Sequence, residues 1–163
     1  MTFAAAAEAY DRFMGRYSVQ LSPQLSDIAG VTAGQKVLDV GCGPGALTGE
    51  LVARLGSEAV AAVDPSESFV AAVRERQPGV DARHAAAERL PFGAETFDAT
   101  LAQLVVHFMS DPAVGLREMA RVTRRGGVVA ACVWNFGGGQ SPVSVFWRAA
   151  LALDRNAEDE SEL

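Results

Sequence analysis

Short apolar runs separated by a helical repeat dominate the hydrophobic pattern of this chain. Residues 36–40 and 59–63 are mostly apolar, and between them apolar side chains recur at helical spacing over 46–55. Gly56 follows this repeat, at the position where a helix usually ends. Runs of this kind are typical of buried parallel strands, and their alternation with helices indicates an α/β fold.

The same alternation continues along the rest of the chain. Further strands are predicted at residues 80–85, 96–104 and 128–134. A capping box at 64–67 begins a helix that extends to about residue 77, and an apolar helix is predicted at 143–153. Asp111-Pro112 begins another helix, and its negative C-terminal end suits Arg121, Arg124 and Arg125.

Two helices are expected before the first strand. One face of the first helix carries Phe3, Ala7, Tyr10, Met14 and Tyr17, with Phe13 beside it. The second begins with Ser22 as its N-cap and Pro23 as its first residue, and Gly30 ends it. Its inner side carries Leu21, Leu25 and Ile28. The face of the first helix either packs on the core or also lines a ligand site.

Composition narrows the functional classes. The 163 residues carry a net charge of −6, most of it in an acidic C-terminal tail, so a basic nucleic-acid-binding surface is not expected. We expect no signal peptide and no membrane span, and therefore a cytoplasmic protein. Cys42 and Cys132 are expected to be free thiols, and no metal-ligand spacing is present in the sequence.

A glycine loop joins the first apolar run to its helix. Gly41-Cys42-Gly43-Pro44-Gly45 allows positive φ and close approach of a ligand to the backbone, although with Ala46 it also fits a loose dinucleotide fingerprint. Asp39 lies at the carboxyl end of the first strand, where a buried charge is costly unless a partner compensates it, and Asp64 lies where a ribose-binding acid belongs. This acidic cradle suits the cationic ligand S-adenosylmethionine, which carries an ammonium group and an unphosphorylated ribose, better than NADP.

Four motifs support this interpretation. They are VLDVGCGPG, VDPSESF, AAAERLPFGAETFDA and ARVTRRGGVV, in this order. The chain resembles the class I S-adenosylmethionine-dependent methyltransferases over about residues 10–154, and within them the small-molecule enzymes of ubiquinone and menaquinone biosynthesis. The resemblance implies a Rossmann-like, doubly wound, mostly parallel sheet of order 3-2-1-4-5 with helices on both faces.

One domain is expected, with three parts that the resemblance defines. They are N-terminal lid helices at 1–30, a cofactor-binding core at 36–136, and a substrate-side helix with an acidic tail at 137–163. The family's last two strands have no counterpart after Asp154, so the chain is expected to be truncated or to depend on a partner. The strand at 128–134 would then lie at a sheet edge, which favours a homodimer or larger assembly.

The cofactor site is assigned from these motifs and from the carboxyl ends of the strands. Its residues are Asp39, Gly41, Cys42, Gly43, Asp64, Pro65, Phe69, Ala86, Ala87, Glu88, Gln103 and Leu104. Several keep a structural alternative: Asp64 as a helix cap, Phe69 as core, and Glu88 as a solvated charge. Ala86 stands where the family often has an aspartate for the adenine amino group, whereas the backbone N–H of Ala87 is still available to the adenine ring.

The substrate side is assigned less directly. His107 is either a general base or a hydrogen-bonded loop residue. The resemblance places Tyr10, Phe13, Tyr17 and Trp134 beside the substrate. The sequence thus predicts methyl transfer from S-adenosylmethionine to a small molecule, without a metal and with S-adenosylhomocysteine as product. The alternatives are a non-catalytic or truncated cofactor-binding scaffold and, as a weaker one, a nicotinamide-dependent oxidoreductase.

Overall fold

The computed structural model describes residues 14–135 and 142–154, and for residues 142–147 only the backbone. The chain divides into two compact units, Met1–Cys132 and Val133–Leu163. Each unit is described by itself. No helix in the described ranges is long and apolar enough to cross a membrane.

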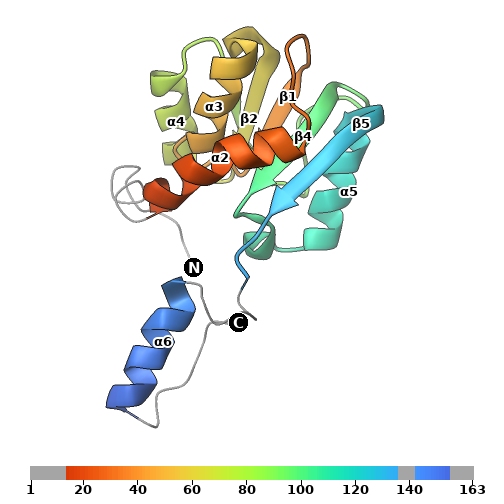
Figure 1. The fold of residues 1–163 in the computed structure, drawn as a ribbon. Coiled ribbons are helices and arrows are strands. Elements are labelled where there is room, and N and C mark those ends of the chain that lie inside the picture. Colours follow the sequence, from red (N-terminus) through yellow and green to blue (C-terminus); the bar gives the residue numbers. More distant parts are fainter. Residues whose placement is uncertain (1–13, 136–141, 155–163) are drawn as a thin grey trace. The chain divides into compact units, whose positions relative to one another are not determined.

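The described part of the first unit is built on one five-stranded sheet in the order β3-β2-β1-β4-β5, in which all neighbouring strands are parallel (Figure 1). The strands are β1 (Val37–Val40), β2 (Val60–Asp64), β3 (Asp81–His84), β4 (Phe97–Gln103) and β5 (Thr123–Cys132). The helices are α2 (Arg16–Ile28), α3 (Ala46–Leu55), α4 (Glu67–Arg76) and α5 (Pro112–Val122). The predicted doubly wound fold and its strand order are confirmed.

Two apolar clusters lie on opposite faces of this sheet. One cluster joins β1, β2 and β4 to side chains of α2, α3 and α4, including Leu25, Leu51 and Val73. The other joins the opposite faces of these strands to Met119 and Val122 of α5. Because β1 is covered on both faces, all four of its residues are buried. The central strand therefore has no solvent-facing side, as its unbroken apolar run predicts.

The N-terminal helix differs from the prediction. Residues on both sides of Pro23 form one helix, α2, and Ser22 is not an N-cap, because its hydroxyl donates to the Ser18 carbonyl oxygen 2.7 Å away. The buried stripe of α2 consists of Ser18, Ser22, Leu25 and Ser26. Ile28 lies off this stripe and is 83% exposed, so its predicted inward position is wrong. Gly30 does follow the helix end, with φ +66°.

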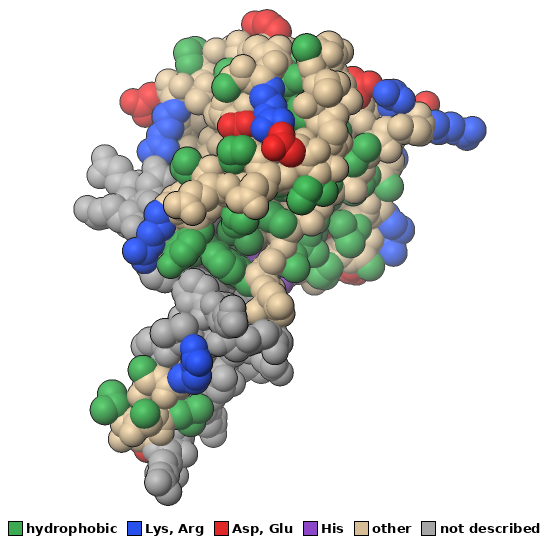
Figure 2. Space-filling view, viewed as in Figure 1, with side chains coloured by type: hydrophobic (Ala, Val, Ile, Leu, Met, Phe, Trp, Pro, Cys, Tyr) green, Lys and Arg blue, Asp and Glu red, His purple; other side chains and the backbone are tan. Residues whose placement is uncertain are grey.

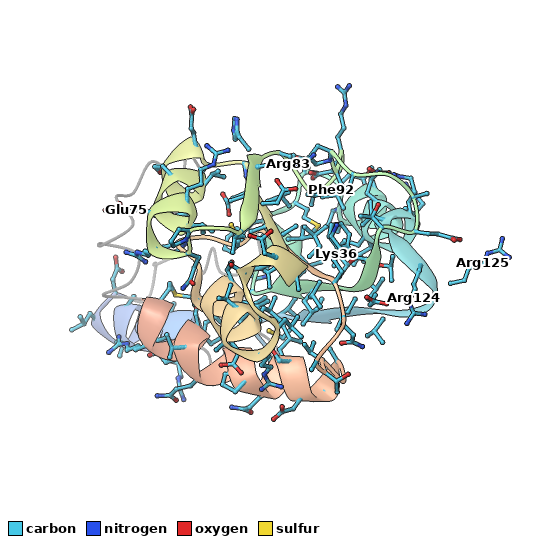
Figure 3. The ribbon with its side chains drawn as sticks, turned by 90° about the horizontal axis from the view of Figure 1, so that it is seen from above. Lys36, Glu75, Arg83, Phe92, Arg124 and Arg125 are labelled. Carbon is cyan, nitrogen blue, oxygen red and sulfur yellow. The ribbon has the colours of Figure 1, made fainter. Side chains whose placement is uncertain are left out.

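Strand β5 begins five residues earlier than predicted. Thr123 pairs with Phe97 in a ladder that is irregular near Gly126, whose φ is +75°. Arg124 and Arg125 therefore lie on β5 and not at the end of α5 (Figure 3). Arg124 extends across to Asp98 of β4, with a nitrogen-to-oxygen distance of 2.6 Å. The capping assigned to these two arginines is wrong, because pairing with β4 competes with continuation of the helix.

The second unit contains α6 (Pro142–Leu153), close to the predicted helix. Trp134 lies in the described segment 133–135, two residues beyond the end of β5, so the predicted strand is too long by two residues. The expectation of a single domain for the whole chain stays a prediction.

Candidate functional site

A small hollow opens at the carboxyl end of the sheet, where β1 meets the glycine loop and β4. Parallel strands of a doubly wound sheet direct their carboxyl ends to one side, which is where such folds bind ligands. The hollow is lined by Ser18, Asp39, Gly41, Cys42, Gly43, Pro44, Ala46, Leu47 and Gln103. Five of the predicted cofactor residues therefore lie together in this lining. Four come from β1 and its loop, and one, Gln103, comes from β4.

The backbone conformation and close packing of the glycine loop require residues without a side chain. Gly41 has φ +70°, its N–H donates to the Val63 carbonyl oxygen at 2.8 Å, and an added Cβ would lie 2.3 Å from Val105 Cγ2. Gly43 and Gly45 also have positive φ, and Gly45 is the N-cap of α3. The loop is therefore held close to β2 on one side and to the segment after β4 on the other.

Asp39 is almost fully buried, with 1% of its surface exposed. Its Oδ2 accepts a hydrogen bond from Thr48 Oγ1 at 2.7 Å, whereas its Oδ1 has no hydrogen-bond partner among the described residues. Burial raises the pKa of this carboxyl to about 7, and the nearby Asp64 adds to the increase. A buried acceptor in the wall of a hollow is suited to a ligand that brings a donor or a positive charge.

Asp64 ends β2 and fixes the loops on both sides of it. Its Oδ2 accepts from the Gly43 N–H at 2.9 Å and its Oδ1 from the Ser66 N–H at 2.8 Å. Burial raises the pKa of Asp64, and these two N–H groups partly offset that increase. Because Ser66 is the N-cap of α4 and its side chain makes no capping hydrogen bond, the predicted capping box is wrong.

Other predicted residues of the adjacent loops lie outside the hollow's lining. Pro65 is exposed, and its carbonyl oxygen lies 2.9 Å from His84 Nε2. Phe69 of α4 is buried, which leaves both core packing and an adenine contact open.

Cys42 does line the hollow, and burial raises the pKa of its thiol well above the ordinary value, so it is not a reactive thiolate.

The loop between β3 and β4 is fastened to α5. Ala86 is exposed, whereas Ala87 is buried. Glu88 Oε1 accepts from the Asp111 N–H at 3.2 Å, which gives this carboxylate a structural role that sequence reasoning did not identify. Farther along, the Arg83 guanidinium carbon lies 4.4 Å from the centre of the Phe92 ring (Figure 3). These contacts hold the loop in place beside the end of β2.

The end of β4 carries three predicted residues. Gln103 lines the hollow and contacts α2 through its side-chain amide. Leu104 has φ +59° and donates its N–H to the Cys132 carbonyl oxygen at 2.8 Å. His107 lies in a short 3-10 helix (Val106–Phe108), outside the lining of the hollow, and partial burial lowers its pKa. A neutral imidazole at physiological pH is compatible with the predicted base, which stays a prediction.

The predicted substrate-side residues are placed only in part. Tyr17 lies on α2, half-buried, with the Arg16 guanidinium carbon 5.0 Å from its ring centre. Trp134 is half-buried within the second unit. Tyr10 and Phe13 lie outside the described residues. Within the described ranges, no group of three or more His, Cys, Asp or Glu side chains is arranged to hold a metal ion.

The site contains residues that were not predicted from the sequence, among them Pro44, Ala46 and Leu47 in the lining of the hollow. Thr48 is fully buried on α3 and is the partner of Asp39; its helical spacing from Leu51 would have identified it as a polar residue on an inner face. Ser18 lines the hollow from α2. Val105 occupies the space that an added Cβ at Gly41 would enter, and no local sequence pattern indicates that contact.

Comparison with known families settles the identity of the domain. Residues 38–131 match a family model described as a methyltransferase domain. The chain belongs to this family. The family model covers the methyltransferase domain from the second residue of β1 to the penultimate residue of β5, so it includes the glycine loop, Asp64 and Gln103.

Similar proteins agree with this assignment. An uncharacterized methyltransferase of Mycobacterium tuberculosis is 38% identical over 135 residues, which cover 83% of this chain and 52% of that protein. A demethylmenaquinone methyltransferase of a Mycobacterium species is 42% identical over 106 residues, 65% of this chain and 44% of that protein. The expected resemblance is confirmed, and the chain spans about half the length of the curated relatives it matches.

A solved structure shows the same fold. The crystal structure of a SAM dependent methyltransferase from Aquifex aeolicus superposes on this chain with a TM-score of 0.69 at 24% identity. The superposition covers 91% of this chain and 85% of that one. At this identity the likeness supports the doubly wound architecture alone.

Proposed function

We propose that the chain binds S-adenosylmethionine and transfers its methyl group to a small-molecule acceptor. The observation that carries the proposal is the buried Asp39 Oδ1, which has no partner among the described residues and belongs to a residue that lines the hollow. A ligand with an ammonium group supplies both the donor and the positive charge that this oxygen lacks. Among ligands that carry an ammonium group, S-adenosylmethionine is the one that the family assignment supports most strongly.

The remaining contacts follow from the ends of the strands. Asp64 is assigned to the ribose hydroxyls, because each carboxylate oxygen has further lone pairs beyond those used by Gly43 and Ser66. The Ala87 N–H and the Phe69 ring are assigned to adenine. Glu88 is a weaker candidate, since one of its oxygens already accepts from the Asp111 N–H.

Methyl transfer from a sulfonium needs little further activation of the donor. The chain's own contribution is to hold the cofactor in one orientation, to bring the acceptor's nucleophilic atom in line with the methyl carbon, and to exclude water. His107 is a candidate for accepting a proton from a hydroxyl acceptor. Tyr17 and Trp134 are assigned to the acceptor side, and no metal is required for this chemistry.

A second function remains in competition. Ala86 lacks the carboxylate that would bind the adenine amino group, which favours a cofactor-binding scaffold without turnover as the alternative. Calorimetric titration with S-adenosylmethionine, S-adenosylhomocysteine and NADH distinguishes the ligand classes, and a methyl-transfer assay over a metabolite panel distinguishes enzyme from scaffold. Tight NADH binding without S-adenosylhomocysteine binding would overturn the proposal.

The assembly state and cellular location are also part of the proposal. In the described part of the chain β5 pairs only with β4, and Val128 and Val129 on it are 38% and 39% exposed. An open strand edge with apolar side chains favours pairing with a second copy of the chain. On the face that Figure 2 shows, arginine and lysine side chains are dispersed, which supports a small-molecule partner over nucleic acid. A cytoplasmic location is the corresponding expectation.

A further inference from the structure

Gln103 connects the carboxyl end of β4 to helix α2 beside the hollow. Its Nε2 lies 3.1 Å from the Ser18 carbonyl oxygen and 3.1 Å from Ser22 Oγ. Ser22 Oγ in turn lies 2.7 Å from the same Ser18 oxygen. The three residues form a closed hydrogen-bonded triangle, although Ser18 and Gln103 are 85 positions apart in the sequence.

The chemistry of these groups fixes the direction of each hydrogen bond. A carbonyl oxygen only accepts, so the amide nitrogen of Gln103 faces Ser18. The Ser22 hydroxyl donates its hydrogen to the Ser18 carbonyl and therefore accepts from Gln103. Both N–H bonds of the Gln103 amide are then used, and its orientation is fixed with Oε1 as the free acceptor.

Two buried acceptors belong to residues that line the same hollow. Gln103 Oε1 and Asp39 Oδ1 each have no hydrogen-bond partner within residues 14–135 and 142–154, and both residues line the hollow. The second oxygen of Asp39 is already satisfied by Thr48. One neutral and one ionisable acceptor together suit a group with several N–H donors, such as a primary ammonium.

We propose that Ser18, Ser22 and Gln103 form a clasp through which α2 orients Gln103 Oε1 as a second acceptor, beside Asp39, for the ammonium group of the bound cofactor. The inference rests on the proposed function and adds α2 to the site. In this arrangement Gln103 is a binding residue and Ser22 is a positioning residue. Recognition of the amino-acid end of the cofactor then depends on α2, whereas recognition of the nucleoside end does not.

Two ligands separate these contributions. S-adenosylhomocysteine carries the ammonium group, and 5′-methylthioadenosine carries the same nucleoside without the amino-acid part. By calorimetry, Gln103→Leu should weaken S-adenosylhomocysteine about tenfold and Ser22→Ala about threefold, as expected for lost hydrogen bonds to a charged group. Both variants should leave the affinity for 5′-methylthioadenosine unchanged. Ser26→Ala is the matched control, because Ser26 is fully buried on the same helix and its hydroxyl has no partner in the described chain.

A second measurement examines the clasp without ligand. Hydrogen exchange of the α2 amides should be faster in Gln103→Leu than in the wild type, and S-adenosylhomocysteine should slow it in the wild type far more than in the variant. Equal weakening of both ligands, or unchanged affinity for both, overturns the clasp while the proposed function stands. Failure of the wild-type chain to bind S-adenosylhomocysteine overturns both.

Discussion

Thr48 of α3 donates a hydrogen bond to Asp39 of β1 over 2.7 Å, inside a core from which both side chains are excluded from solvent. The hydroxyl satisfies one carboxylate oxygen, and the other is buried without a hydrogen-bond partner among the described residues. Helix and strand thereby hold a carboxylate whose ionisation is costly until a cation reaches it. This relationship makes Asp39 the most sensitive point of the site to pH.

Asp39→Asn should stabilise the ligand-free protein at alkaline pH. Burial raises the pKa of Asp39 from 3.8 to about 7, so ionisation of this carboxyl lowers the free energy of unfolding. This loss of stability is absent below pH 3.8, grows between pH 3.8 and about pH 7, and is complete above about pH 7. That loss is at most about 4 kcal/mol. Thermal melting at pH 5 and pH 8 should show the variant gaining relative to wild type as pH rises.

Thr48→Val and Thr100→Val form a matched pair for the same measurement. Both threonines are fully buried and hydrogen-bonded, but the Thr100 hydroxyl bonds that of Thr123 and touches no carboxylate. Thr48→Val should raise the pKa of Asp39 further and steepen the loss of stability above neutral pH. Thr100→Val should lower stability equally at both pH values. An identical pH dependence in the two variants would contradict this account of Asp39.

Asp64→Ala should weaken binding of S-adenosylhomocysteine by about 2 kcal/mol, because the ribose hydroxyls that we propose it binds, together with two backbone N–H groups, lose their acceptor. Asp111→Ala is the control, since Asp111 also accepts a backbone N–H, at the start of α5, but does not line the hollow. Both variants should lose stability, measured by denaturant titration. Unchanged affinity in Asp64→Ala would remove Asp64 from the ligand site.

Gly41→Ala should abolish cofactor binding and lower stability. The added methyl group would overlap Val105, and alanine is strained at the φ of +70° that Gly41 adopts. The double variant Gly41→Ala/Val105→Ala removes the overlap with the two Cγ atoms of residue 105 but keeps the close approach of its Cβ, in addition to a backbone strain of about 1 kcal/mol. Chemical denaturation should therefore show partial recovery in the double variant. Additive losses of stability would mean that the Gly41–Val105 contact does not limit this position.

His107→Ala should lower methyl-transfer turnover by less than about tenfold and leave cofactor affinity unchanged, because His107 lies outside the hollow's lining. Its 3-10 helix should lose stability, since the imidazole packs with its ring centre 4.2 Å from that of Phe108. Turnover and thermal melting are measured on the same preparation. A loss of 100-fold or more at unchanged melting temperature would instead make His107 the general base, as such losses are typical of one.

Val128→Lys should shift a dimer toward monomer. In the described part of the chain Val128 lies on an edge strand, β5, and a charge at such an edge opposes pairing with another chain. Leu116→Lys is the control on α5, because Leu116 has the same exposed fraction of 38%. Light scattering across a concentration series gives the assembly state. A wild-type chain that stays monomeric at high concentration would rule out this edge as an interface.

Most of the fold was predictable because it depends on local patterns. The strand runs and the helix Ala46–Leu55 follow from apolar periodicity, whereas the order of the strands was inferred from the family resemblance and from right-handed crossovers. Boundaries failed where a tertiary contact competes with a local preference. Pairing with β4 extends β5 back to Thr123, and the buried serines of α2 carry the helix through Pro23.

The site was predictable only where one strand end determines it. Asp39, the glycine loop and Asp64 are adjacent to strand ends, so the sequence places them together. Thr48, Ser18 and Val105 reach the same region from other elements, and nothing in their local sequence reveals which neighbour they meet. Glu88 likewise shows its contact with the Asp111 N–H only in three dimensions.

The distance in sequence between Ser18 and Gln103 has a consequence for biosynthesis. The ribosome releases α2, β1 and the glycine loop long before β4, and until β4 arrives β1 has a strand neighbour on one side only. Because Gln103 at the end of β4 is part of its lining, the hollow is completed only after β4 has been synthesised. A ligand that needs the whole lining of this hollow therefore stabilises only chains whose synthesis has passed β4.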